Sequence, residues 1–144
     1  MRISAKTVYG VRALLDLALH IDQGPILSRD IAQRQNIPET YLNQLVLQLR
    51  RSGLITSVRG PHGGHMLARP AGALSVLEIW EALEGPLVVV TDNDTDGNQA
   101  RADAVLNGVW DSLRITMRQE LAHTTLGDLS ERLRSAHSEL TYEI

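Results

Sequence analysis

Residues 28–69 constrain the fold more than any other part of the chain, because their helix signals leave few alternatives. Ser28 is a favourable N-cap for a short helix over residues 29–35, since its hydroxyl can accept a hydrogen bond from a first-turn amide. Pro38 can begin a second helix, where its missing N–H would have no partner in any case. Gly53 ends that second helix. The pattern therefore predicts two short consecutive helices.

A glycine-rich hairpin is expected directly after the second helix. Residues 54–58 and 65–67 favour two short strands, and the tip between them is Arg59-Gly60-Pro61-His62-Gly63-Gly64. Glycines allow close approach to another backbone. An arginine at such a tip can enter a narrow minor groove, where the negative potential attracts a guanidinium. Two helices followed by this hairpin are typical of a winged helix-turn-helix.

The two faces of the second helix differ in composition. One face repeats apolar residues at helical spacing, and these are Leu42, Leu45, Val46 and Leu49. The opposite face is polar, with two arginines near its end, and consists of Thr40, Asn43, Gln44, Gln48, Arg50 and Arg51. Asn and Gln suit adenine in the major groove, whereas a merely solvated face is normally rich in Glu and Lys. The face predicts base reading, with an ordinary solvated surface as the alternative.

The sequence resembles the Rrf-two (Rrf2) family of bacterial winged-helix transcription regulators along nearly its whole length. The resemblance rests on MRISAKTVYGVRALLDLA, IAQRQNIPETYLNQLVLQLRRSGLITSVRGPHGGHMLARP and LEIWEALEGPL, and on VWDSL and TTLGDL near the end. The run from Tyr41 to Gly64 is far more specific than a general helix-turn-helix match. The resemblance implies a mainly α fold with a small β-hairpin wing, in which a winged helix-turn-helix is followed by a long dimerisation helix.

The resemblance also implies which residues contact DNA. In the family the second helix reads the major groove and the wing enters the minor groove, which carries over to Thr40, Tyr41, Asn43, Gln44 and Arg59. The remaining residues expected at DNA lie at helix starts, in basic positions and on the wing: Arg2, Lys6, Ser28, Pro38, Arg50, Arg51, Gly60, Gly63, Gly64 and His65. Relatives usually carry an acidic residue at the position of Asn43, so the operator is expected to differ from theirs.

The charge distribution agrees with a nucleic-acid partner, although the overall charge of −3 taken alone does not. Residues 1–70 hold nine Arg and Lys against four acidic residues, a net charge of +5. Residues 71–144 hold five against thirteen, a net charge of −8. Charges more than about 8 Å apart are largely independent at physiological salt. The basic half can therefore bind phosphates while the acidic half stays in solvent.

Two further helices are expected around this region. Ser4 is a good N-cap for a helix over residues 5–22, whose apolar face would hold Val8, Val11, Leu15, Ala18 and Leu19. Residues 26–27 are expected to form a short strand beside the wing. Ser75 and Glu78 form a capping box for a helix that ends at Gly85, with Trp80 as a core or interface residue. The apolar residues 87–90 would pair as a strand or pack as an extended segment.

An acidic loop occupies residues 91–98, where many relatives carry three cysteines that hold an iron–sulfur cluster. This chain has no cysteine, so thiolate ligation of a cluster is excluded and no cofactor is expected. The chain thus resembles the cluster-free repressor of cysteine metabolism more than the iron–sulfur cluster regulator. The loop also has the spacing of a calcium loop, through Asp92, Asp94, Asp96 and Asp103. The usual bidentate glutamate is missing, and a solvated acidic loop is the preferred interpretation.

The longest helical pattern runs from residue 99 to about residue 123. Its apolar residues form two adjacent stripes, one for the chain's own domain and one for a second copy, as in dimeric relatives. A single broad core face is the alternative. The expected dimer interface consists of Val105, Leu106, Val109, Trp110, Leu113, Met117 and Leu121. A final helix beginning near Thr125 is expected to fold back on the long one.

Other classes of function find little support. The sequence has no nucleophile elbow, phosphate loop or dinucleotide fingerprint, so an enzyme is not expected. His62 and His65 lie three residues apart without a visible third metal ligand. No apolar run approaches the length of a membrane span, and the N-terminus lacks a signal-peptide core. We expect a cytoplasmic protein without a membrane partner.

We therefore predict three segments: a winged helix-turn-helix DNA-binding domain at residues 1–85, an acidic loop at 86–98, and a dimerisation helix with a C-terminal helix at 99–144. The predicted function is that of a sequence-specific transcription regulator, a homodimeric repressor on a near-palindromic double-stranded operator. The alternative is a protein-interaction module that binds a partner such as a metabolic enzyme and contacts DNA weakly.

Overall fold

The computed structural model describes residues 2–88 and 100–142, which form a mainly helical fold with one small hairpin, as expected. Its α-helices are α1 (Ala5–Leu19), α2 (Ser28–Gln35), α3 (Glu39–Arg51), α4 (Val76–Glu84), α5 (Ala100–His123) and α6 (Leu126–Tyr142). Short 3₁₀ turns lie at Ile21–Gln23 and Ala71–Ala73. Strands β1 (Ile55–Val58) and β2 (Gly64–Leu67) pair antiparallel, with Ile55 opposite Leu67 and Val58 opposite Gly64.

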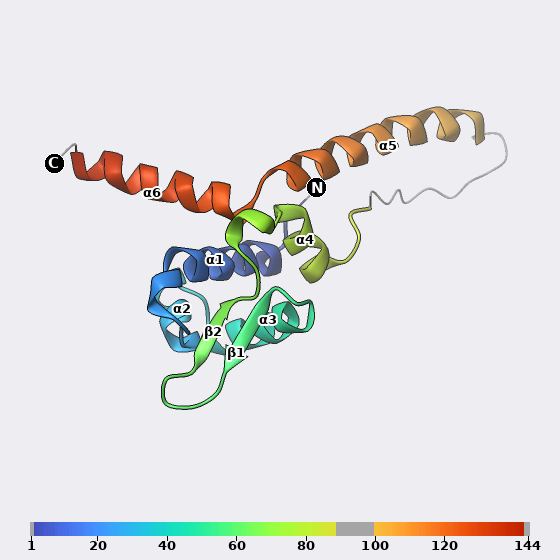
Figure 1. The fold of residues 1–144 in the computed structure, drawn as a ribbon. Helices are drawn as coiled ribbons and strands as arrows, with labels where there is room; N and C mark the ends of the chain where they lie inside the picture. Colours follow the sequence, from blue (N-terminus) through green and yellow to red (C-terminus); the bar gives the residue numbers. More distant parts are fainter. Residues whose placement is uncertain (1, 89–99, 143–144) are drawn as a thin grey trace.

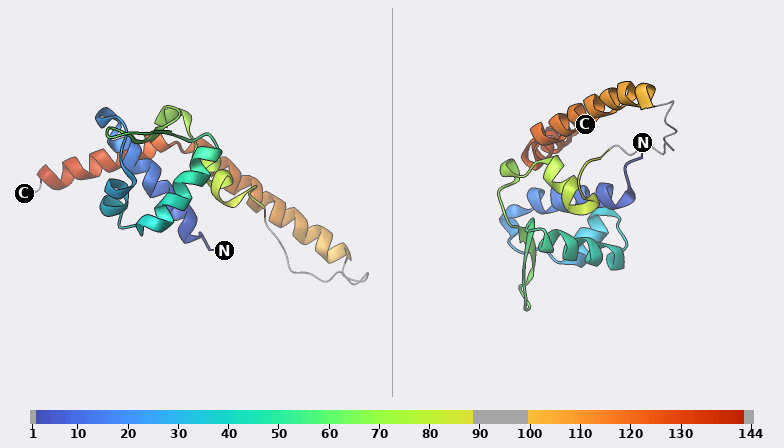
Figure 2. Two further views of the ribbon diagram at one scale, coloured as in Figure 1. Left: turned by 90° about the horizontal axis from the view of Figure 1, so that it is seen from below. Right: turned by 90° about the vertical axis from the view of Figure 1, so that its right-hand side faces the viewer.

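The hairpin and the long helix lie at opposite ends of the molecule. Figure 1 shows α1, α2, α3 and the hairpin gathered into one body, from which the hairpin tip projects. Helices α5 and α6 leave the other side of this body in opposite directions. The right-hand view of Figure 2 places the hairpin tip at one extreme and α5 at the other. The tip is therefore free to meet a partner while α5 meets another.

A single aliphatic core holds α1 to α4 together. Its fully buried members come from helices α1 to α4, from β1, from the segment before α4 and from the start of α6, and include Leu14, Ile31, Leu42, Leu45, Leu49, Ile55, Leu74, Ile79 and Leu126. The chain contains no phenylalanine, so branched aliphatic side chains supply nearly all of this contact. Because Leu126 is among them, the first turn of α6 is anchored in the same core. Burial of such side chains is the main favourable term for the fold.

The buried face of α1 differs from the expected one. Val8 is 38% exposed, and Val11, Leu15 and Leu19 are only partly buried. Ala18 is buried as predicted, and the rest of the buried face consists of Thr7, Gly10, Ala13, Leu14 and Leu17. Helix α1 packs against α2, α3, α4 and α6, and close packing on several sides requires small side chains. At Gly10 a Cβ would lie 2.3 Å from Leu83 Cδ1. The helix also stops at Leu19, and a 3₁₀ turn replaces the predicted last turn.

A buried ion pair joins α1 to α2. The carboxylate of Asp16 is fully buried and receives hydrogen bonds from Arg34 Nε (2.9 Å) and Nη2 (2.8 Å). Gln35 Nε2 donates a third bond at 3.1 Å. The hydrogen bond to Asp16 raises the pKa of Arg34. Bidentate pairing with these additional donors is what makes a buried carboxylate tolerable.

The helix ends explain the turns between the helix-turn-helix elements. Asn36 ends α2 in the left-handed conformation (φ 53°), and Gly53 follows α3 with φ 78°. Both conformations agree with the residue types found there. Ser28 is not the N-cap of α2, because that helix begins one residue earlier than predicted and Leu27 occupies the cap. The Ser28 hydroxyl is bonded to His65 instead.

The first turn of α6 is fixed in a way that sends the helix across α1. Thr125 and Asp128 cap each other's backbone N–H groups at 3.1 and 3.0 Å. A backbone bridge ties this turn to the segment before α4, through Val76 N–H to Thr124 O (2.9 Å) and Leu126 N–H to Leu74 O (2.8 Å). The predicted folding of α6 back onto α5 is therefore wrong. Helix α6 packs on α1 and on the 3₁₀ turn at Ala71–Ala73.

Helix α4 begins and ends with polar contacts. Ser75 Oγ accepts the N–H of Glu78 at 3.1 Å, which is half of the predicted capping box. The Glu78 carboxylate pairs with Arg69 rather than returning to the helix start. Arg118 on α5 forms an ion pair with Glu81 at 2.5 Å. Leu87 is buried and Val88 is exposed, while residues 89 and 90 of the predicted apolar run lie outside the described residues.

The buried ion pair generates the first prediction. Replacing Arg34 by methionine leaves the buried Asp16 carboxylate without its bidentate partner, and we expect a loss of about 3 kcal/mol in the free energy of unfolding. Urea denaturation followed by circular dichroism measures this loss. The matched control is Arg29→Met, at an exposed arginine of the same helix, which should change stability by less than about 0.5 kcal/mol. Equal effects of the two substitutions would contradict the role given to Asp16.

Candidate nucleic-acid interface

The polar face of α3 is exposed. Thr40, Asn43, Gln44, Arg50 and Arg51 all face solvent, and Pro38 precedes the helix as its exposed N-cap. The opposite face, Leu42, Leu45, Val46 and Leu49, is buried as predicted. Glu39 in the first turn and two arginines in the last turn follow the helix dipole. The helix thus presents short amide and hydroxyl side chains on a rigidly held surface.

Two polar residues of α3 are positioned differently from the rest. Tyr41 is half-buried, and its ring packs edge-to-face on Tyr9 of α1 with centroids 5.7 Å apart. The spacing predicted that Gln48 lies on the exposed polar face, but its side chain turns toward α4 instead. Its amide donates to the carbonyls of Ala82 (3.0 Å) and Leu83 (3.1 Å). These carbonyls lie in the last turn of α4, where no helical N–H can reach them.

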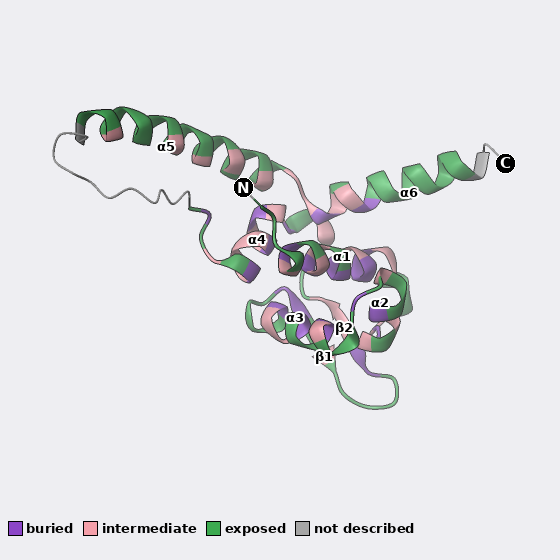
Figure 3. Cartoon of the chain, turned by 180° about the vertical axis from the view of Figure 1, so that it is seen from behind, coloured by how far each residue is buried: buried purple, intermediate pink, exposed green. Residues whose placement is uncertain are grey.

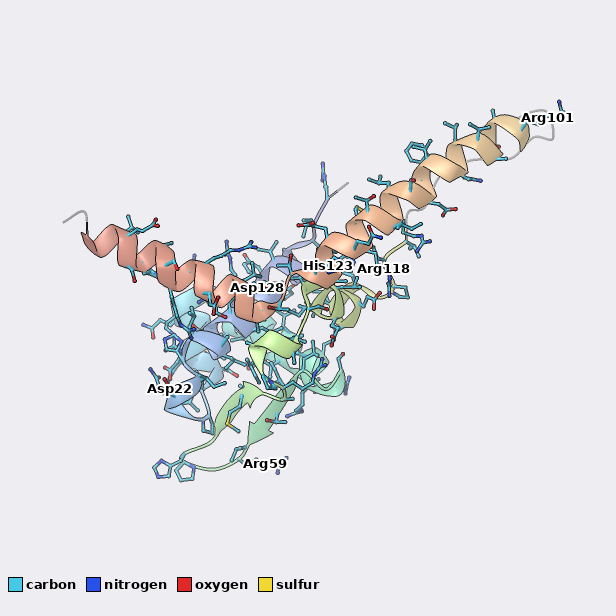
Figure 4. The ribbon with its side chains drawn as sticks, turned by 45° about the horizontal axis from the view of Figure 1, so that its top comes forward. Asp22, Arg59, Arg101, Arg118, His123 and Asp128 are labelled. Carbon is cyan, nitrogen blue, oxygen red and sulfur yellow. The ribbon has the colours of Figure 1, made fainter. Side chains whose placement is uncertain are left out.

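The tip of the hairpin is exposed and its base is tightly packed. Arg59 is exposed at the start of the tip, and Figure 4 shows its side chain directed away from the body. Gly60 has φ 110° and accepts the N–H of Gly63 at 2.9 Å. A Cβ on Gly63 would lie 2.2 Å from Val58 O. The glycines expected at this position are therefore required by the turn itself.

The base of the hairpin is joined to the segment that leads into α2. Gly64 has φ 149°, and a Cβ there would lie 2.5 Å from the carbonyl of Ile26. Ile26 and His65 exchange backbone hydrogen bonds at 2.7 and 3.0 Å. The short strand expected at residues 26–27 is thus a single bridge. It attaches β2 directly to the helix-turn-helix.

The side chain of His65 connects three elements. Its Nε2 lies 2.7 Å from Ser28 Oγ on α2, and its Nδ1 lies 2.7 Å from Ser57 Oγ on β1. The ring is half-buried, and burial, followed by the charge of Arg50, lowers the pKa of His65 below its ordinary value. Both ring nitrogens of His65, a residue expected at DNA, are thus engaged in bonds within the protein. A shallow groove beside it is lined by Ser28, Arg29, Glu39, Val58 and Gly60.

The basic residues at the start of α1 lie away from the wing. Arg2 is exposed and Lys6 is half-buried. Thr7 donates a hydrogen bond to Glu84 Oε1 at 2.7 Å, and Ser4 donates to the same oxygen. These bonds, and then the charge of Lys6, lower the pKa of Glu84. Arg12 is exposed and lies 6.0 Å above the ring of Tyr9. The α1 start therefore carries positive charge next to the end of α4.

Helix α5 is largely uncovered along its length. Four of the seven residues predicted at the dimer interface are exposed: Val105 (73%), Leu106 (43%), Val109 (53%) and Leu113 (44%). Figure 3 shows this part of the helix as almost entirely exposed. Trp110, Met117 and Leu121 are half-buried, and the latter two line an apolar groove with Trp80 and Leu87. The stripe predicted from Leu106, Trp110, Leu113, Met117 and Leu121 is thus divided, because Leu106 and Leu113 are exposed like Val105 and Val109, and the other three are half-buried.

Metal ligands are not assembled in the part of the chain that the structure describes. Asp92, Asp94 and Asp96 of the calcium-loop spacing lie outside the described residues, and Asp103 is half-buried in the first turn of α5. Among residues 2–88 and 100–142, no group of three or more His, Cys, Asp or Glu side chains could hold a metal ion. Within the same ranges, no helix combines the length and apolar character needed to cross a membrane.

The fold and this surface define a winged-helix transcription regulator of the DNA-binding type. A model of the Rrf2 family, described as an iron-dependent transcriptional regulator, matches residues 3–132. The chain is 38% identical over 132 residues to a putative HTH-type transcriptional regulator, ORF2, from Azotobacter vinelandii, which covers 92% of this chain and 80% of that protein. It is 36% identical over 129 residues to the HTH-type transcriptional regulator IscR of Klebsiella pneumoniae, covering 90% and 79%. The chain belongs to the Rrf2 family.

Solved structures agree with this membership. CymR, described as the global cysteine regulator of B. subtilis, superposes with a TM-score of 0.75 at 34% identity, covering 92% of this chain and 98% of that one. IscR from T. potens superposes with a TM-score of 0.77 at 34% identity, covering 94% and 90%. The predicted fold class and family are confirmed. The two sequence relatives are transcriptional regulators by name, which agrees with the expectation of a regulator.

The iron dependence in the family description does not fit a thiolate site in this chain. Iron–sulfur clusters are generally held by cysteine thiolates, and the sequence contains no cysteine at any position. The described residues also lack a cluster of alternative ligands. The similarity to CymR agrees with the expected resemblance to the repressor of cysteine metabolism.

The close approach at Gly64 generates the second prediction. Gly64→Ala places a methyl group against the Ile26 backbone at a positive φ, so we expect a loss of about 1 to 3 kcal/mol in the free energy of unfolding. Gly72→Ala is the matched control, because its Cβ would meet nothing within 4 Å. Thermal unfolding of the two variants measures the difference. A Gly64→Ala protein as stable as the control would mean that the hairpin base is not locked to Ile26.

Proposed function

We propose that this chain acts as a homodimeric repressor that binds a near-palindromic double-stranded operator. One observation carries the proposal: the exposed amides of Asn43 and Gln44 and the exposed guanidinium of Arg59 stand on two elements fixed to one rigid body. A helix with short polar side chains fits the major groove, and a hairpin tip with one arginine fits the minor groove. Repression follows from occupying DNA that the transcription machinery needs, so we place its action in the cytoplasm, with the chromosome.

The residues proposed to face DNA divide into three groups: those that read bases, those that contact phosphates, and those that shape the surface. Thr40, Asn43 and Gln44 read base edges, and Arg59 senses a narrow, A·T-rich minor groove. Arg50 and Arg51, with Arg2 and Lys6 at the start of α1, contribute salt-dependent contacts to phosphates. Ser28, Pro38 and the wing residues Gly60, Gly63, Gly64 and His65 shape the surface that meets the backbone. Tyr41 is assigned to this supporting group, because its ring packs on Tyr9.

The second copy is proposed to bind along α5. Val105, Leu106, Val109 and Leu113 expose apolar side chains on one helix, and contiguous exposed apolar surface marks sites of association. A dimer through α5 would present two reading helices to successive major grooves, about 34 to 36 Å apart or a multiple of that distance. The chain contains no cysteine for a cluster-based signal, so we propose that control does not pass through a thiolate-held cluster.

The reading role of Asn43 is the third prediction. Asn43→Ala should weaken binding to the specific operator by about 1 to 3 kcal/mol and leave binding to random DNA nearly unchanged, because only base contacts distinguish the two. The operator is first obtained by selecting duplexes from a random library with the wild-type protein, and affinities are then measured by fluorescence anisotropy at fixed salt. The matched control is Arg51→Ala, a phosphate contact, which should weaken both complexes alike. Equal losses for Asn43→Ala on both duplexes would remove Asn43 from base reading.

The dimer generates the fourth prediction. Leu113→Glu places a carboxylate in the proposed α5 interface and should convert the dimer to a monomer in analytical ultracentrifugation, because an unpaired charge cannot be buried without a large penalty. Ile21→Glu is the matched control. Ile21 is also an exposed aliphatic residue (54% exposed), but it lies in the 3₁₀ turn after α1 and not on α5. The control variant should remain dimeric. A Leu113→Glu protein with wild-type mass would place the interface elsewhere.

A further inference from the structure

We propose that His65 is a positioning residue for DNA binding: with Ser28 and Ser57 it forms a cross-brace that sets the wing at a fixed angle to the reading helix α3. The inference rests on the proposed function, because it concerns how the two DNA-contacting elements are held relative to each other. Three elements meet at one imidazole ring, which stands on β2 and bonds to α2 and β1. We refer to His65, Ser28 and Ser57 as the wing brace.

The geometry of the wing brace is that of two good hydrogen bonds. Both ring nitrogens lie 2.7 Å from a serine oxygen. A neutral imidazole has one donor and one acceptor nitrogen, and a serine hydroxyl can donate or accept. One serine therefore accepts from the ring and the other donates to it, in either tautomer. Burial and the neighbouring Arg50 favour the neutral ring, the form that can donate on one side and accept on the other.

The inner end of the hairpin is held by Ile55, which is buried in the core, whereas the outer part projects from the body and has fewer supports. Each strand has four residues, and an isolated two-stranded hairpin of this size is marginal in water. The backbone bridge between Ile26 and His65 fixes one point of contact. A single point does not prevent the hairpin from tilting about it. The bond from His65 to Ser28 adds a second contact between the hairpin and the start of α2, beside this bridge. The bond to Ser57, which lies directly opposite His65 on β1, holds the ring in the orientation that reaches Ser28. Together they limit the tilt of the hairpin.

The tilt matters because a small rotation at the base of the hairpin moves the tip, with Arg59, over a larger distance. Arg59 directly follows β1, and Asn43 lies on α3, which is tied to α2 through the turn at Asn36. Helix α2 is in turn clamped to α1 by Asp16 and Arg34. Ser28 is therefore a fixed point on the body that carries α3. The wing brace relates the position of Arg59 to that of Asn43, as simultaneous entry into two grooves requires.

A side chain that merely fills space would behave differently in a mutant cycle. In the wing brace, the two serines act through the ring, so removing the ring abolishes the effect of removing either serine. A serine that contacts phosphate by itself would lose affinity whether the ring is present or not. Substitutions that keep part of the hydrogen bonding should also restore part of the function. Asn at position 65 can reach Ser57, because its amide lies near the position of Nδ1. Gln reaches further, to the position of Nε2 and Ser28.

The experiment measures affinity for the duplex that the wild-type protein selects from a random library, together with amide hydrogen exchange of the free protein. Ser28→Ala and Ser57→Ala should each weaken operator binding about three- to tenfold, the loss typical of one hydrogen bond. His65→Leu should weaken it by at least as much, and adding either serine substitution to His65→Leu should cause no further loss. His65→Asn and His65→Gln should lie between wild type and His65→Leu. Ser52→Ala, at an exposed serine after α3, is the control and should bind as wild type does.

Hydrogen exchange gives an independent readout without DNA. The amides of Ile26 and of residue 65, which form the backbone bridge, should exchange several-fold faster in His65→Leu and in the Ser28→Ala, Ser57→Ala double variant. The amide of Leu45 in the buried stripe of α3 should be unchanged. Additive losses in the mutant cycle, or unchanged exchange at the bridge, overturn the proposal.

Failure of the wing brace and failure of the proposed function are distinguishable. If the wild-type protein enriches no duplex, the proposed function is wrong, and hydrogen exchange alone then decides whether the wing brace exists. If the wild-type protein selects an operator and His65→Leu binds it equally well, the function stands and the positioning role of His65 is wrong.

Discussion

The buried carboxylate of Asp16 is the interaction on which the arrangement of the DNA-facing elements depends. It is buried between α1 and α2, and Arg34 and Gln35 reach it from the end of α2. An ionised group in that position is tolerable only with donors in fixed places, so α2 has one orientation on α1. Both elements of the proposed DNA surface are then placed relative to α2: α3 through the turn at Asn36, and the hairpin through Ile26 and Ser28.

The elements that the sequence predicted best are those whose signals are local. The buried stripe of α3, its end at Gly53 and the glycine tip of the hairpin all follow from spacing or from the conformational range of one residue. The capping signal at Thr125 also placed the start of α6 correctly. In each case neighbours along the chain determine the structure, so a pattern in the sequence is sufficient.

The failures share the opposite property. The buried face of α1 includes Gly10 and Ala13, where four helices converge on it, and the periodicity of large apolar residues cannot reveal that. Gln48 has the spacing of a reading residue, yet α4 offers its terminal carbonyls on that side. The direction of α6 depends on a backbone bridge to the segment before α4. Ser28 and His65 are 37 residues apart, and nothing in the sequence pairs them. The residues proposed to contact DNA could be nominated from the sequence, whereas the contacts that orient them could not.

The amide of Gln48 links α3 to α4, so α4 connects α3 with the long helix α5. One end of the connection is on the reading helix, where Gln48 holds the last carbonyls of α4. The other is the ion pair between Glu81 and Arg118, which holds α4 to the long helix. If α5 slid or rotated, either the ion pair between Arg118 and Glu81 would be strained, or α4 would move with α5 and strain the hydrogen bonds from Gln48. The proposed DNA surface and the proposed dimer helix lie at opposite ends of the protein, yet one short helix, α4, contacts both α3 and α5.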